Sequence, residues 1–146
     1  MAEKMSTALC NKMMDTGSFK SIFSGTTAEL RVYSGAVPAT ADAAITGVKI
    51  AVVKEAGLAL NFLAAAVGGV LAKSAAAWTD AAAVGGVATH YRLCLAADTD
   101  ALDSTTYPRV QGTVNTVGAD MNVSSTTIGA AAVFPMNYYT QAFVPS

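Results

Sequence analysis

Residues 89–95, with the sequence THYRLCL, form the stretch that decides the fold. From Tyr91 onward its apolar residues alternate with polar or small ones, and His90, Arg92 and Cys94 occupy the even-numbered positions. Alternation with a period of two places the two sets on opposite faces of an extended chain. The stretch therefore predicts a β-strand with one apolar face and one polar face.

Similar runs occur on both sides of this stretch, separated by turn residues about every 8–15 positions. A pair of glycines, Gly68 and Gly69, between two apolar runs favours a tight hairpin turn. Pro135 indicates an edge strand or the first residues of a strand. The pattern predicts a mainly β fold, a β-sandwich or jelly-roll-like barrel of about eight short strands. The expected strands are residues 30–33, 48–53, 58–63, 70–78, 89–95, 109–114, 120–123 and 133–144.

The first 28 residues follow a different period. Residues 5–14 have helical spacing, and Ser6 or Thr7 can cap the helix. A helix this short is not stable alone, so it has to pack on its own domain or on a neighbour. We expect an N-terminal helical arm or interface segment over residues 1–28 and a β-sandwich domain over 29–146. The candidate interface residues, all large and apolar or aromatic, are Met5, Leu9, Met13, Phe19, Phe23, Tyr138 and Tyr139.

The composition is unusually poor in charge. The 146 residues fit one domain, and 53% are hydrophobic while 13% are charged, against about 25% charged in ordinary soluble domains. The most apolar stretch, residues 56–72, is interrupted by Asn61 and a glycine pair, so no membrane span is expected. The N-terminus has no apolar signal region. A net charge of −1 without a basic run argues against a nucleic-acid partner.

The residues that usually carry catalysis or bind metals do not form a recognisable motif. His90 is the only histidine, and Cys94 on the same strand face lies about 13 Å away, so we predict a structural histidine. Cys10 and Cys94 have no metal-site spacing and are expected to be reduced, small buried residues. Residues 98–103 carry three carboxylates without the calcium-loop pattern, which favours a solvated acidic loop over a weak cation site. No catalytic residue, metal or cofactor is predicted.

Four segments, taken in order, resemble a known group of proteins. They are residues 30–44 (LRVYSGAVPATADAA), Trp78, residues 88–93 (ATHYRL) and residues 111–125 (QGTVNTVGADMNVSS). Their order and spacing are similar to those of small Ala/Gly/Thr-rich virion structural proteins of tailed bacteriophages. The chain departs from that pattern around residues 98–108, where the loop is longer.

The resemblance implies a non-enzymatic virion structural protein that is assembled in the bacterial host cytoplasm. The first expectation is a head decoration, or cement, protein that binds the major capsid protein as a homo-oligomer, with a trimer favoured. The alternatives are a tail or neck component bound to other virion proteins, and a receptor- or carbohydrate-binding β-module. A small hydrolase would instead need His90 close to Cys10 or to a carboxylate in a cleft.

Overall fold

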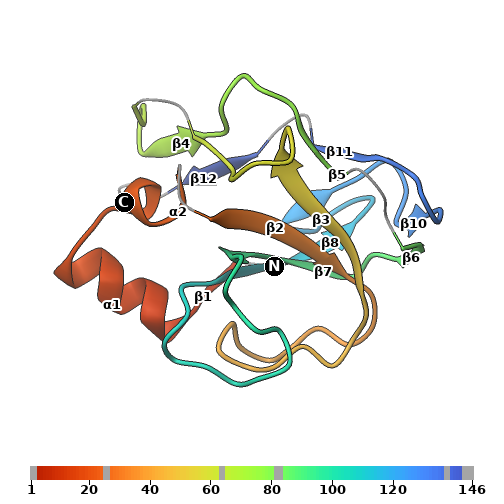
Figure 1. Ribbon diagram of the computed structural model, residues 1–146, viewed down its shortest axis with the longest axis horizontal. Coiled ribbons are helices and arrows are strands. Elements are labelled where there is room, and N and C mark those ends of the chain that lie inside the picture. The colour runs from red at the N-terminus through yellow and green to blue at the C-terminus, as the bar shows by residue number, and fades with distance from the viewer. Residues whose placement is uncertain (1–2, 25–26, 63–64, 81–83, 137–138, 143–146) are drawn as a thin grey trace.

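The computed structural model describes residues 3–24, 27–62, 65–80, 84–136 and 139–142, and its elements are shown in Figure 1. Most elements of the described chain are strands, and two short helices lie near the N-terminus. This confirms a mainly β fold with a helix near the N-terminus. The elements are β1 (Lys4–Met5), α1 (Thr7–Asp15), α2 (Phe19–Phe23), β2 (Ala28–Tyr33), β3 (Lys49–Glu55), β4 (Val70–Ala72), β5 (Trp78–Asp80), β6 (Gly86–Val87), β7 (His90–Leu95), β8 (Val110–Asn115), β9 (Met121–Asn122), β10 (Thr127–Ile128), β11 (Phe134–Met136) and β12 (Thr140–Ala142).

One large sheet organises the molecule. Its strand order is β1-β8-β7-β2-β3-β5-β11, all pairs are antiparallel, and β9 adds to β8 in parallel. The quoted stretch forms β7, at the centre of the sheet between β2 and β8. Its register places Leu93 opposite Leu30 and Arg92 opposite Arg31. The predicted strand and its two-faced character are thus confirmed, and both faces are buried.

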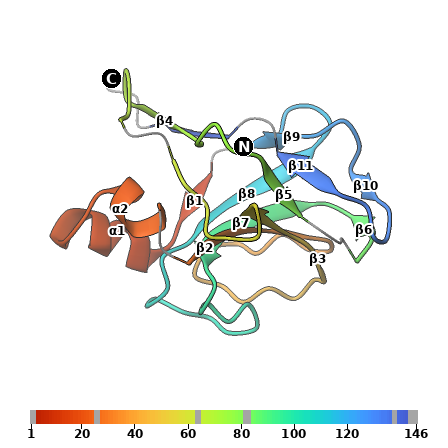
Figure 2. The same cartoon turned by 45° about the horizontal axis from the view of Figure 1, so that its top comes forward.

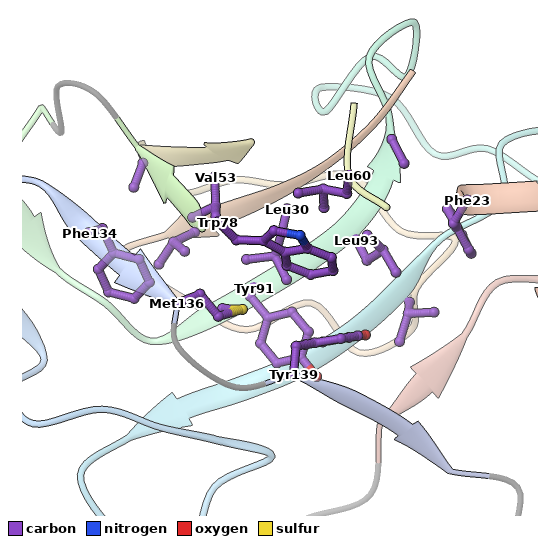
Figure 3. Packing of buried hydrophobic residues seen from close by; sticks show 14 of the residues in the cluster. Phe23, Leu30, Val53, Leu60, Trp78, Tyr91, Leu93, Phe134, Met136 and Tyr139 are labelled. Carbon is purple, nitrogen blue, oxygen red and sulfur yellow. The ribbon is translucent and has the colours of Figure 1, made fainter. Parts of the chain in front are cut away.

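The apolar face of this sheet packs against a second layer. Short pairs of strands, β4 with β12 and β6 with β10, lie outside the main sheet, and Figure 2 shows β4 on the opposite side of the sheet from the long loops. Trp78 is fully buried between Phe62 and Tyr139, with ring centroids 5.4 and 5.6 Å away. Figure 3 shows Trp78 above Tyr91 and Tyr139, with Leu93 of the central strand beside it. The arrangement is that of a sandwich with one large and one smaller layer.

Two sequence predictions about strands need correction. Residues 58–62 form no extended strand: Leu58 and Phe62 make single bridges, and Leu60 points into the core. Residues 70–78 do not form one strand: β4 ends at Ala72 and pairs with β12, and β5 begins at Trp78 in the large sheet. The hairpin prediction is confirmed, since Gly68 and Gly69 have φ of 59° and 78° between the bridged Val67 and Val70. Pro135 lies in β11, the edge strand, as expected.

The final predicted strand, residues 133–144, is also interrupted. Its described parts are β11 and β12, which pair with β5 and β4 respectively. The end of the chain therefore contributes to both layers, whereas alternation along one continuous strand would have placed it in a single sheet.

The N-terminal segment is part of the same fold. Ser6 caps α1 by accepting a hydrogen bond from the backbone N–H of Leu9. Strand β1 pairs with β8, and α2 adds two phenylalanines to the core. Ala28 already belongs to β2. The boundary expected at residue 28 therefore does not separate an arm from a domain.

Two long loops cover the polar face of the large sheet. Residues 34–48 connect β2 to β3, and residues 96–109 connect β7 to β8; both run along the lower side of the molecule in Figure 1. Backbone hydrogen bonds join them, from Ile45 N to Asp100 O at 2.7 Å and from Ser104 N to Asp42 O at 2.8 Å. The loops therefore form a connected cover beneath the sheet.

Candidate functional site

Charged and polar side chains fill the space between the sheet and its loop cover. They come from alternate positions of β2, β7 and β8 and from the loop of residues 96–109, and most are buried. We call this set the ionic layer: Glu29, Arg31, Tyr33, His90, Arg92, Asp98, Asp100, Arg109 and Gln111. Buried charges are tolerated only when they are paired and hydrogen-bonded, so the partners of each group decide what the layer can do.

The Arg109–Asp98 pair lies deepest, with both side chains fully inaccessible. Arg109 Nε and Nη2 donate to the two carboxylate oxygens of Asp98 at 2.7 and 2.6 Å, a bidentate arrangement. Burial opposes the charge of Arg109, but Asp98 outweighs it and raises the pKa of the guanidinium. The guanidinium also donates to the carbonyl oxygens of Ala41 and Asp42. Arg109 therefore links the loop of residues 96–109, which also contains Asp98, to the loop of residues 34–48.

A second ion-pair group is centred on Arg31. Its Nε donates to Glu29 at 2.6 Å and its Nη1 donates to Asp100 at 2.5 Å. Asp100 also accepts from the hydroxyl of Tyr33 at 2.7 Å and from Lys49 at 3.0 Å. Burial opposes ionisation of Asp100, yet these hydrogen bonds outweigh it and lower the pKa of the carboxyl.

The expectation of a solvated acidic loop is therefore wrong for Asp98, which is buried, and for Asp100, which is half-buried, whereas Asp103 is exposed. Asp98 and Asp100 pair with arginines, and Asp103 accepts a hydrogen bond from the backbone N–H of Ala44 at 2.6 Å. Within the described ranges no group of three or more His, Cys, Asp or Glu side chains is arranged to hold a metal ion. The alternating polar residues of β2 and β7, each strand followed by a long loop, were the sequence signal for this layer.

Arg92 and His90 occupy the middle of the layer and have fewer partners. Arg92 Nη2 donates to Ala43 O and to the side chain of Gln111, whereas its Nε and Nη1 are buried without a hydrogen bond. Burial and the nearby Arg109 lower the pKa of Arg92. His90 stacks on Tyr33 at 5.2 Å, and burial followed by Arg92 lowers its pKa to about 4. His90 is therefore a neutral, buried ring at neutral pH.

The two cysteines have contrasting environments. Cys94 is buried on the polar face of β7, and burial raises the pKa of its thiol to about 12. Cys10 is exposed on α1, so the expectation that both are buried is wrong for Cys10. His90 Nδ1 shares a hydrogen bond with the hydroxyl of Thr89. Cys94 lies farther along the same face of β7, beyond Arg92.

Most of the candidate interface residues belong to the protein's own core. Leu9, Phe19, Phe23 and Tyr139 are buried, so their predicted role at an interface is corrected: apolar spacing identified a buried face, and that face packs inside the chain. Met5 and Met13 are half-buried and pack at the edge of the core. Tyr138 lies outside the described residues. The large apolar side chains that reach the surface include Met14, Val84, Val117 and Val133.

A cavity of about 680 Å³ is lined mainly by residues between 120 and 140, together with Glu3 and Tyr91. Tyr91 and Tyr139 lie among its lining residues, together with the carboxylates of Glu3 and Asp120. The Tyr91 hydroxyl donates to Glu3, and burial followed by the neighbouring Tyr139 and Glu3 raises the pKa of this phenol. No sequence motif marked Glu3 or Asp120, because the two residues lie at distant positions in the chain.

Comparisons with known proteins add no assignment to these sites. No protein-family model matches the sequence, and neither the curated proteins nor the solved structures give a match. In the described part of the chain no helix is long and apolar enough to cross a membrane.

Proposed function

We propose that this chain is a non-enzymatic structural protein of a tailed-bacteriophage virion and that it decorates the outside of the capsid shell as a homo-oligomer. The observation that carries the proposal is a surface with few charges. The chain has nine basic and ten acidic residues, and Glu29, Arg31, Arg92, Asp98 and Arg109 are buried. The charge left for the surface is therefore even lower than the composition suggests.

Few charged residues lie in the two segments that form β6 and β10, which pair with each other at one end of the molecule in Figure 1. Residues 110–146 contain a single charged residue, Asp120, and residues 81–89 contain none. Val84, Val87 and Val133 are more than half exposed in this region, and Val117 is 81% exposed. Soluble monomers rarely expose apolar groups together without a binding role. Contact with neighbouring subunits would cover this end.

The edges of the large sheet favour contacts through side chains over the addition of further strands. The outer edge of β8 is paired with β1 at Val110 and Gln111 and with β9 at Val114 and Asn115. Between them, the Asp120 carboxylate accepts the backbone N–H of Thr113 at 2.8 Å. At the opposite edge, β11 contains Pro135, which cannot donate to a further strand. Closed edges favour a discrete oligomer, which suits a decoration protein.

A reconstruction of the particle of a phage whose genome encodes this chain tests the proposal. Density for the fold on the outer face of the shell, at threefold positions, is the expected result. Density confined to the neck or tail would support the tail alternative and overturn the decoration role. A particle without the protein would overturn the virion assignment. Light scattering on the purified chain should give a mass of three copies, and a stable monomer would contradict the trimer.

A further inference from the structure

The cavity lined by Glu3, Tyr91 and residues between 120 and 140 has a distinct chemical character. Its apolar wall includes Ile128, Phe134 and Met136, and serine, threonine and asparagine side chains also line it. Its volume of about 680 Å³ lies within the range of about 300–1,000 Å³ that is usual for ligand sites. It is thus large enough for an extended side chain together with the backbone that carries it.

Two carboxylates, Glu3 and Asp120, line this cavity from distant positions in the chain. Strand β1 pairs Lys4 with Gln111, and the same register brings Glu3 towards Gly112. Asp120 is held at the next residue of β8, because its Oδ2 accepts from Thr113 N at 2.8 Å and from Thr113 Oγ1 at 2.9 Å. The hydroxyl of Tyr91 donates to Glu3.

Tyr91 and Gly112 bring these groups close together. A methyl group placed on Gly112 would lie 2.6 Å from the ring and the hydroxyl of Tyr91, so the ring rests directly on the backbone of β8. Glu3 therefore accepts a hydrogen bond from this phenol, and Asp120 is bound to the residue of β8 that follows Gly112. The described residues that line this cavity include the two carboxylates and no lysine or arginine. Lys4 lies nearby, because it lines a smaller neighbouring pocket together with Asp120.

The lining disfavours several ligand classes. An anion would be repelled by Glu3 and Asp120. A sugar usually stacks on an exposed aromatic face, but Tyr91 and Tyr139 are 1% and 6% exposed. A compact cation carried on an apolar stem fits better, because an ammonium group can lie between two carboxylates from separate segments while its methylene groups contact the apolar wall.

We propose that this cavity binds an alkylammonium group, specifically the side chain of a lysine on a neighbouring protein. Glu3 and Asp120 contact the ammonium group, and the more accessible apolar lining residues Met121, Val123 and Val133 contact the methylene stem. The inference goes beyond the proposed virion role and does not depend on it, because the ligand chemistry can be measured on the isolated chain.

Binding is measured by NMR titration of the isotopically labelled full chain with Nα-acetyl-lysine methylamide. The matched comparison is Nα-acetyl-norleucine methylamide, which has the same stem length without the ammonium group. We expect the lysine probe to shift the amide signals of residues 120–134 and to bind about tenfold more tightly than the norleucine probe. Higher salt should weaken binding of the lysine probe and leave that of the norleucine probe unchanged.

The variants Glu3→Gln and Asp120→Asn test the two carboxylates. Each keeps an oxygen that can accept the hydrogen bond from Tyr91 or Thr113, so the fold is preserved while one charge is removed. We expect each variant to weaken lysine binding by about threefold to tenfold. Asp15→Asn, which removes an exposed carboxylate at the end of α1, is the control and should bind as the parent does.

Several results would overturn the assignment. They are equal binding of the two probes, unchanged affinity in both variants with parental melting temperatures, or no shift at the highest soluble concentration. Tighter binding of Nα-acetyl-arginine methylamide than of the lysine probe would assign the cavity to a guanidinium group instead of an ammonium group. Tighter binding of free 1,4-diaminobutane would exclude a protein side chain as the natural ligand. None of these results bears on where the protein lies in a particle.

Discussion

The two faces of the large sheet are both buried, but different interactions bury them. On one face, Leu30 and Leu93 lie opposite each other and pack beneath Trp78. On the other face, one position along the same strands, Arg31 and Arg92 lie opposite each other. Like charges at such positions are destabilising unless each has its own acceptors. Arg31 has Glu29 and Asp100, whereas Arg92 has one carbonyl and one amide oxygen.

This difference shows what alternation in a sequence can and cannot indicate. Alternating apolar and polar residues usually mark a strand with one face in solvent. Here the polar face is covered by two loops, and it contains enough carboxylates to neutralise its buried arginines. The apolar face depends on close packing, whereas the polar face depends on specific pairs. Mutations and acid should therefore affect the two faces in different ways.

The largest effect is expected on the apolar face, from Trp78→Ala. The change removes the ring between Phe62 and Tyr139 and the hydrogen bond from Trp78 Nε1 to Glu55 at 3.1 Å. We expect a loss of about 3–5 kcal/mol in the free energy of unfolding, measured by urea denaturation. Leu58→Ala, at a position 73% exposed, is the control and should change stability by less than about 0.5 kcal/mol. A similar loss in both variants would contradict the assigned core.

On the polar face, Arg109→Met should cost about 3–4 kcal/mol because it leaves the buried carboxylate of Asp98 without its partner. The double variant Arg109→Met/Asp98→Leu removes both charges and should recover a large part of that loss. Both are measured by urea denaturation at neutral pH. If the double variant were less stable by the sum of the two single losses, the two residues would not act as a pair.

Acid should weaken the polar face at a pH set by His90. Its pKa of about 4 in the folded protein lies below the value of about 6.5 in the unfolded chain. Below pH 6.5 the unfolded state therefore binds a proton that the folded state does not. The free energy of unfolding should fall by about 2–3 kcal/mol as the pH drops from 6.5 to 4.

The matched variant for this pH effect is His90→Phe, which retains a ring against Tyr33 but cannot be protonated. Its stability should change little between pH 6.5 and 4.5. At lower pH, protonation of Asp100 should destabilise both proteins, because hydrogen bonds lower the pKa of this carboxyl in the folded state. A parent protein whose stability is constant from pH 6.5 to 4 would rule out a buried neutral His90.

The smallest effect is on thiol reactivity, which reports how often the loop cover opens. Cys10 is exposed and should react with a disulfide reagent at the rate of a free thiol, whereas Cys94 is buried with its pKa raised to about 12. We expect Cys94 to react at least about a hundredfold more slowly. Asp103→Ala, which removes a link between the loops, should speed the reaction of Cys94 and leave that of Cys10 unchanged.

Local pattern was sufficient for several elements of the fold. Alternation identified β7, the glycine pair identified the hairpin at Val67–Val70, and Ser6 was one of two predicted caps for α1. Where the prediction failed, the sequence pattern did not specify the partner. Residues 58–62 have the composition of a strand, but the packing of Leu60 and Phe62 against the core replaces strand pairing there.

The sequence by itself determined a charge-poor, mainly β protein whose central strand has one apolar and one polar face, because these properties depend on composition and on a period of two. Only the tertiary structure decided that the polar face is buried, that the N-terminal apolar residues belong to the core, and that Glu3 and Asp120 line one cavity with Tyr91. The physical reason is that pairing of buried charges and convergence at a cavity depend on contacts between residues far apart in the chain, and local periodicity carries no information about such contacts.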